Sequence, residues 1–276
     1  MIQWAKMELN KIYLGDTSET LKEFPSAFFD ITVTSPPYNK MGVKGGLVDE
    51  VKYKNTSDVR NEQEYQVDQT SVLAELWRVT KPGGHIFYNH KIRWVEGKMI
   101  HPLEWVSLTA WALRQEIIWD RQIAGQLRGW RFWQTEERIY WMQKGITKGH
   151  ELASKHAKLG SIWKIRPETR FQEHPAPFPV AIPTRCIYSI ADDQRGLNIL
   201  DPYCGIGSTL VAAKVLQHNY VGIDCCAEYI KLAEERLQDP HEIDHVQWET
   251  KLHVVEETYQ QKKTKRDIKQ SHTILP

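Results

Sequence analysis

The chain has 276 residues, of which 41% are hydrophobic and 26% are charged, and its formal net charge is +1. These values are ordinary for a soluble globular protein of one or two domains. No apolar run approaches the roughly 18 residues of a membrane span, and the first residues lack a signal peptide, so we expect a cytoplasmic protein without membrane contact. The neutral balance excludes a strongly basic protein, so any contact with DNA has to come from local clusters of charge.

Cysteine and tryptophan usage indicates a reduced and well-packed interior. The four cysteines form neither a C-x-x-C pair nor a zinc-like spacing with histidine, so we expect free thiols and no metal site. Among the tryptophans, Trp105, Trp111 and Trp119 lie in apolar segments and are expected in the core.

Strand-like and helix-like segments alternate along the chain, which is typical of a mostly parallel sheet covered by helices. Residues 29–34 form a β-rich run that ends at Ser35-Pro36-Pro37, where two prolines cannot continue a ladder. Residues 66–79 carry apolar side chains on one helical face, and Lys81-Pro82-Gly83-Gly84 stops this helix. A strand at 85–89 follows.

The pattern weakens in the middle of the chain and returns near its end. We expect a helix at 103–113, strands at 115–119 and 138–142, and mostly loops from 144 to 183. A regular strand–helix–strand–helix unit then occupies 198–201, 208–217, 220–224 and 227–237.

The segment from Asp201 to Thr209, with the sequence D-P-Y-C-G-I-G-S-T, joins a strand of this unit to the next helix. Gly205 and Gly207 allow a tight turn that a ligand can approach closely, and Ser208 or Thr209 can cap the helix. Asp224, at the end of the following strand, stands where a carboxylate can bind ribose hydroxyls.

This loop favours S-adenosylmethionine over a nicotinamide cofactor. The third glycine of the dinucleotide fingerprint is missing. A carboxylate at Asp201 would repel a pyrophosphate but could receive the cationic amino acid group of S-adenosylmethionine. For the glycine pair alone, a purely structural turn is the alternative.

The tetrapeptide Ser35-Pro36-Pro37-Tyr38, preceded by Thr34, follows a strand at the edge where open α/β sheets bind ligands. The exocyclic amino nitrogen of cytosine or adenine is a poor nucleophile, because its lone pair is delocalised into the ring. The Ser35 hydroxyl and the Pro36 carbonyl could accept its two N–H groups and free that lone pair. Tyr38 would stack on a flipped base, and methyl transfer would be a direct in-line attack. The alternative is a rigid Pro-Pro turn with a packed tyrosine.

In this order, these blocks resemble the DNA amino-methyltransferases of the permuted (beta) group, in which the catalytic loop precedes the cofactor loop. Three blocks carry the resemblance: Thr34–Tyr38, His174–Pro179 (H-P-A-P-F-P), and Asp201–Thr209 with Gly222–Asp224. Supporting matches extend it over most of residues 12–238. The resemblance implies a doubly wound, mostly parallel, Rossmann-like α/β methyltransferase fold with circularly permuted motifs.

The resemblance also implies residue roles in the cofactor site. Asp201, Gly205 and Gly207 would surround the methionine part, Asp224 would bind the ribose and Asp16 would lie near the adenine. Phe178 would close over the cofactor from the other side. The predicted cofactor-binding set is Asp16, Thr34, Phe178, Asp201, Tyr203, Gly205, Gly207, Ser208 and Asp224.

In this family, serine at the first position of the tetrapeptide is typical of enzymes that act on cytosine N4, and aspartate is typical of adenine N6 enzymes. We therefore expect a site-specific methyltransferase that forms N4-methylcytosine in duplex DNA by base flipping, within a restriction-modification system. Adenine N6 methylation is the nearest alternative, and an oxidoreductase or a non-catalytic DNA-binding protein is a remote one. The predicted catalytic residues are Ser35, Pro36, Pro37 and Tyr38.

The expected organisation is a catalytic domain over residues 1–240 followed by a polar extension over 241–276. The inserted target-recognition segment, at about 144–161, is short for the family, so two further stretches are candidates for DNA contact. Arginine suits bidentate contacts with guanine, although a solvated charged loop is the alternative for each stretch. The candidates are Lys40, Lys44, Arg121, Arg128 and Arg131. The expected partners are duplex DNA and a cognate restriction endonuclease, and a homodimer is left open.

Overall fold

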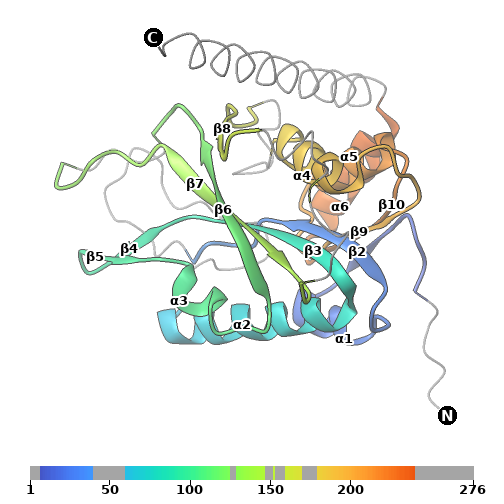
Figure 1. The fold of residues 1–276 in the computed structure, drawn as a ribbon, viewed down its shortest axis with the longest axis horizontal. Coiled ribbons are helices and arrows are strands. Elements are labelled where there is room, and N and C mark those ends of the chain that lie inside the picture. Colours follow the sequence, from blue (N-terminus) through green and yellow to red (C-terminus); the bar gives the residue numbers. More distant parts are fainter. Residues whose placement is uncertain are drawn as a thin grey trace, which may run out of the picture.

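The computed structural model describes residues 7–39, 60–124, 129–146, 152, 159–169 and 179–239. Within these ranges an eight-stranded sheet lies between two groups of helices, as Figure 1 shows. The strand order is β1-β10-β9-β2-β3-β7-β6-β8. Strand β7 is antiparallel to its neighbours β3 and β6, and the other paired strands are parallel. The predicted doubly wound, mostly parallel α/β fold is confirmed.

The strands of this sheet are β1 (Lys11–Leu14), β2 (Phe29–Thr34), β3 (Thr80–His90), β6 (Ala112–Asp120), β7 (Glu136–Gln143), β8 (Ile162–Lys164), β9 (Asn198–Asp201) and β10 (Asn219–Asp224). A separate antiparallel hairpin consists of β4 (Arg93–Val95) and β5 (Lys98–Ile100). Side chains alternate between the two faces: Ile31 and Val33 of β2 pack on one side, and Phe29 packs on the other.

The helices are α1 (Thr17–Lys22), α2 (Glu62–Val79), α3 (Leu103–Val106), α4 (Ala181–Ala191), α5 (Ser208–Val215) and α6 (Ala227–Gln238). The first three cover one face of the sheet, and the last three cover the other (Figure 1). Helix α2 buries the apolar stripe that its sequence predicts. The three tryptophans assigned to the core, Trp105, Trp111 and Trp119, are buried. In the described part of the chain, no helix has both the length and the apolar character needed to cross a membrane.

Strands β2 and β9 lie side by side at the point where the winding of the sheet reverses. The chain leaves β9 through α5 toward β10, whereas it leaves β2 through α2 toward β3 on the opposite side. Because β2 and β9 are parallel, the loops that follow them open at the same carboxyl edge. Such a switch point is the usual ligand-binding position of an open α/β sheet.

Three of the predicted elements differ in the structure. The helix expected over 103–113 ends at Val106, because Trp111 turns back to donate from Nε1 to the Leu73 carbonyl (2.9 Å) before β6 starts. Strand β3 starts at Thr80, directly after α2, and the Pro82-Gly83-Gly84 segment lies where its register with β2 shifts. The region expected to be mostly loops up to 183 contains β8 and the start of α4. Pro183 is compatible with α4, because a first-turn proline lacks an N–H that no helical partner would accept.

Candidate active site

The loops after β2 and β9 are tied together by side-chain hydrogen bonds. The Thr34 hydroxyl donates to Asp201 Oδ1 (2.9 Å), and the Thr209 hydroxyl donates to the Val33 carbonyl (3.2 Å). From the third side, the Thr17 hydroxyl of α1 donates to the Pro202 carbonyl (2.6 Å). The structure therefore brings the predicted catalytic loop, the predicted cofactor loop and the start of α1 to one place.

Asp201 is a buried carboxylate at the end of β9. Besides Thr34, the Tyr203 amide donates to its Oδ1 (3.1 Å). Burial raises the pKa of Asp201 to about 6, against the opposing hydrogen bonds from Thr209, Thr34 and Tyr203. A buried carboxylate of this kind favours a positively charged ligand group.

Asp224, at the end of the neighbouring strand β10, organises the loop from its other side. Its Oδ2 accepts from the Gly205 amide (2.8 Å) and its Oδ1 accepts from the Cys226 amide (2.8 Å). Burial nevertheless raises the pKa of Asp224 above its usual value. Each oxygen keeps a further lone pair, so this carboxylate can still accept from hydroxyl groups of a ligand.

Asp16 lies at the same edge, because the Gly15 amide donates to the Asp224 carbonyl (3.0 Å). Its carboxylate caps α1 by accepting from the Ser18 and Glu19 amides (2.8 and 3.2 Å) and from the Ser18 hydroxyl. Burial opposes its charge, but these bonds outweigh burial and lower the pKa of Asp16. Asp16 is thus held ionised beside the cofactor loop.

The turn between β9 and α5 requires both of its glycines. Gly205 and Gly207 have φ values of +49° and +80°. A Cβ at Gly207 would also meet Ala233 Cβ of α6 at 2.8 Å, so this glycine serves the packing of α5 on α6. The prediction that Ser208 or Thr209 caps α5 is wrong: Gly207 is the N-cap, and no described side chain caps this helix. The Ser208 hydroxyl instead accepts from Arg236 (3.1 Å) beneath the turn.

The catalytic loop is fastened from below by buried polar side chains. The Ser35 hydroxyl lies 2.6 Å from the Tyr38 hydroxyl, and Tyr38 donates to Glu137 Oε2 (2.9 Å). Asn89 Nδ2, at the end of β3, donates to Ser35 Oγ (3.2 Å), to the Tyr38 hydroxyl and to Glu137 Oε2 (3.0 Å). Arg121 pairs with the other oxygen of Glu137 (3.2 Å).

Tyr38 itself is buried, with its ring against that of His90 at a centroid distance of 4.8 Å. Its hydroxyl is anchored by Glu137 and Asn89. Stacking of Tyr38 on a flipped base therefore stays a prediction, and it would have to use the part of the ring turned away from His90.

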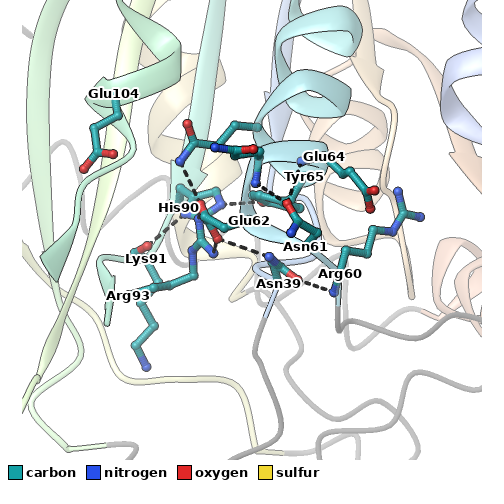
Figure 2. A network of polar contacts seen from close by, with 12 residues as sticks. Asn39, Arg60, Asn61, Glu62, Glu64, Tyr65, His90, Lys91, Arg93 and Glu104 are labelled. Atoms are coloured by element: carbon teal, nitrogen blue, oxygen red, sulfur yellow. Dashed lines mark hydrogen bonds and ion pairs between the residues drawn. The ribbon is translucent and has the colours of Figure 1, made fainter. Parts of the chain in front are cut away.

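A second polar network holds the far end of the same loop to α2 (Figure 2). The Tyr65 hydroxyl donates to the Pro37 carbonyl (2.7 Å) and contacts His90 Nε2 (2.6 Å). Asn39 donates to Glu62 (3.2 Å), whose carboxylate also receives the Arg93 guanidinium. Burial opposes the charge of Glu62, but Arg93 outweighs it and lowers the pKa of Glu62. The loop is thus held rigidly at both ends.

Neither network was recognised from the sequence. Asn89, Glu137, Tyr65 and Glu62 lie far from the tetrapeptide along the chain and share no motif with it. One signal was available for Asn89 and Glu137. Each is a polar residue near the end or start of an otherwise apolar strand, where β3 and β7 pair at the carboxyl edge.

The predicted DNA-contacting residues separate into three groups. Lys40, Lys44 and Arg128 lie outside the described residues, as does Phe178 of the predicted cofactor set. Arg121 is largely buried and paired with Glu137. Arg131 lies in the β6–β7 connection, with its guanidinium 3.7 Å from the centroid of Trp94. Most of the expected insertion at 144–161 and the extension at 241–276 also lie outside the described residues.

Comparison with known proteins connects this geometry to a family. The family model N6_N4_Mtase, described as DNA methylase, matches residues 29–235. The chain is 30% identical to the Type II methyltransferase M.BglII of Bacillus subtilis over 270 residues, which cover 85% of this chain and 70% of that protein. It is 26% identical to the Type II methyltransferase M.SmaI of Serratia marcescens, with 82% and 90% of the two chains covered.

Two solved structures share the fold. PvuII DNA methyltransferase (cytosine-N4-specific) superposes with a TM-score of 0.67 at 17% identity, and the match covers 87% of this chain and 92% of that one. The DNA modification methylase TTHA0409 of Thermus thermophilus, complexed with S-adenosyl-L-methionine, gives a TM-score of 0.61 at 23% identity, with 84% and 94% covered.

Proposed function

The chain belongs to the N6/N4 DNA methylase family, and from this premise we propose that it methylates the N4 amino group of cytosine in duplex DNA. The methyl donor is S-adenosylmethionine. The observation that carries the proposal is the hydrogen bond from Thr34 to Asp201, because it fixes Ser35 beside the two carboxylates of the cofactor loop. The donor and the acceptor of a methyl group have to meet at such a junction.

The cofactor loop has the chemistry that S-adenosylmethionine requires. Asp201 is a buried carboxylate that would be stabilised by the ammonium group, and Asp224 has lone pairs for the ribose hydroxyls. Asp16 and Tyr203 would lie beside the adenine and the amino acid part. When bound, this cofactor supplies an electrophilic methyl group on a positively charged sulfur.

The catalytic loop would activate the amino group by accepting its protons. Ser35 Oγ and the Pro36 carbonyl are the proposed acceptors, and the Pro37 carbonyl is already engaged by Tyr65 (2.7 Å). Two fixed acceptors would draw the nitrogen toward a tetrahedral shape and free its lone pair for in-line attack. Because the loop is anchored at Tyr38 and at Asn39, these acceptors need little reorganisation during the reaction.

Cytosine is favoured over adenine by the serine at position 35. The similarity to PvuII DNA methyltransferase, named as cytosine-N4-specific, agrees with this choice. Since M.BglII and M.SmaI are named Type II methyltransferases, we further propose that the chain protects the recognition site of a cognate restriction endonuclease.

Expression in a bacterial host without DNA methylation tests this function directly. Long-read sequencing that detects modified bases should show N4-methylcytosine at one short sequence motif, and a Ser35→Ala variant should leave that motif unmodified. N6-methyladenine at the motif would support the adenine alternative. An unmodified genome from cells that contain folded, S-adenosylmethionine-binding protein would contradict the proposal.

A further inference from the structure

The buried carboxylate of Glu137 lies beneath the catalytic loop, and it has no role in the function proposed so far. It stands near the start of β7 and is 6% exposed. Its Oε2 accepts from Tyr38 and Asn89, and its Oε1 accepts from Arg121. A buried charge is costly unless it is compensated, and Arg121 provides the compensating charge.

This carboxylate determines the direction of the hydrogen bonds above it. An ionised carboxylate can only accept, so Tyr38 donates its single hydroxyl proton to Glu137. In the 2.6 Å contact between Tyr38 and Ser35, the Ser35 hydroxyl must then be the donor. The proton of Ser35 therefore points into the protein, and its oxygen keeps lone pairs for outside donors.

Asn89 obeys the same constraint. Its amide nitrogen faces Glu137 and Ser35, which leaves its buried Oδ1 without a hydrogen-bond partner among the described residues. An unpaired buried acceptor costs about 1–3 kcal/mol. The amide keeps this orientation because the carboxylate requires a donor, so two separate contacts of Ser35 are directed by Glu137.

We propose that Glu137 is a positioning residue that, through Tyr38 and Asn89, presents Ser35 as a hydrogen-bond acceptor, and that it receives the proton which the base loses. This inference rests on the proposed methylation of an amino group. As the nitrogen–methyl bond forms, the sulfur–methyl bond breaks and its electron pair stays on the sulfur. The nitrogen passes one proton to Ser35, Ser35 passes its own to Tyr38, and Tyr38 passes its own to Glu137. The positive charge of the sulfonium and the negative charge of Glu137 are both lost, so charge balances.

The substitution Glu137→Gln tests this role, because glutamine has the same shape but can donate a hydrogen bond. We expect kcat to fall by about 10²-fold, within the range for a lost general base, while the Kd values for S-adenosylmethionine and DNA stay within about twofold. The matched control is Glu136→Gln on the same strand. Its carboxylate faces Arg138 at 3.8 Å, and its activity should equal that of the wild type.

A double-mutant cycle with Tyr38→Phe separates the proposed role from a merely structural one. If Glu137 acts through the Tyr38 hydroxyl, Glu137→Gln should reduce kcat by less than about threefold in the Tyr38→Phe background. Fully additive losses, or an unchanged kcat in the single variant, would overturn the inference while the proposed function stands. Wild-type protein that binds cofactor but methylates no DNA base would overturn the proposed function and this inference together.

Discussion

At the scale of single residues, the cofactor site depends on carboxylates that are kept in an unfavourable environment. Asp201 is buried and its pKa is raised to about 6, and the pKa of Asp224 is raised as well. In the unliganded protein each charge is therefore destabilising near neutral pH. A cationic ligand reverses this effect, because its ammonium group stabilises the ionised carboxylate.

This environment predicts opposite pH dependences for cofactor binding and for stability. Affinity for S-adenosylmethionine should fall as pH drops through about 6, because Asp201 becomes protonated and no longer attracts the ammonium group. Since the folded pKa lies above the ordinary value of 3.8, the contribution of Asp201 to the stability of the unliganded fold is complete below that value and is lost as pH rises through about 6. Calorimetry and thermal unfolding between about pH 5 and pH 8 measure both quantities.

The Asp201→Asn variant is the control for this prediction. It should bind the cofactor weakly at every pH, and the acid-linked loss of affinity should be much reduced. A wild-type affinity that is flat across this range would show that Asp201 does not carry the cofactor's positive charge.

At the scale of secondary-structure elements, the position of the cofactor loop depends on how closely α5 approaches α6. Gly207 combines a positive φ of +80° with a site where a Cβ would meet Ala233 Cβ at 2.8 Å. Gly97 in the β4–β5 hairpin has nearly the same φ, +79°, but its Cβ would meet nothing within 4 Å. The two glycines thus separate backbone strain from packing.

Replacing each glycine with alanine should give different losses. Gly97→Ala should cost about 1–2 kcal/mol in unfolding free energy from the left-handed backbone alone. Gly207→Ala should cost a further 1–3 kcal/mol or so, because the extra methyl group overpacks the α5–α6 contact. It should also weaken cofactor binding, since the loop has to move. Equal losses in urea denaturation would contradict the packing account.

The elements that the sequence predicts well are those whose signals are local. Strand β2 ends at two prolines, and β9 leads into the glycine turn, so the catalytic and cofactor loops could be placed from short segments. Helix α4 escaped prediction because ten of its residues are buried, which removes the polar face that marks an amphipathic helix. The contacts of Glu137 depend on the pairing of β3 with β7, and no local pattern encodes that pairing.

At the scale of the whole molecule, DNA binding has to be reconciled with a net charge of +1. The connection between β6 and β7 exposes aromatic side chains: Phe132 is 99% exposed, Trp133 is 60% exposed and Trp130 is 59% exposed. It begins at the carboxyl end of β6, and in Figure 1 it projects on the same side as the β4–β5 hairpin. Exposed aromatic groups at this edge can stack on bases, which does not require a basic surface.

We therefore expect Phe132→Ala to weaken DNA binding by about 10-fold, within the roughly 1–3 kcal/mol of a base–aromatic contact. Cofactor affinity and the salt dependence of DNA binding should not change, because an apolar contact releases no counterions. The matched control is Leu108→Ala, since Leu108 is 74% exposed but lies before the amino end of β6. Fluorescence anisotropy with duplex DNA at several salt concentrations measures this effect, and equal affinities for the two variants would exclude the loop from the interface.

The central claim is that Ser35 directs methyl transfer from S-adenosylmethionine to cytosine N4. The most direct test is mass spectrometry of nucleosides from duplex DNA incubated with the purified protein and S-adenosylmethionine that carries a deuterated methyl group. The wild type should place the label in N4-methylcytosine, and Ser35→Ala should lose that product while it still binds the cofactor. Label in N6-methyladenine, or undiminished N4-methylcytosine from Ser35→Ala, would contradict the account.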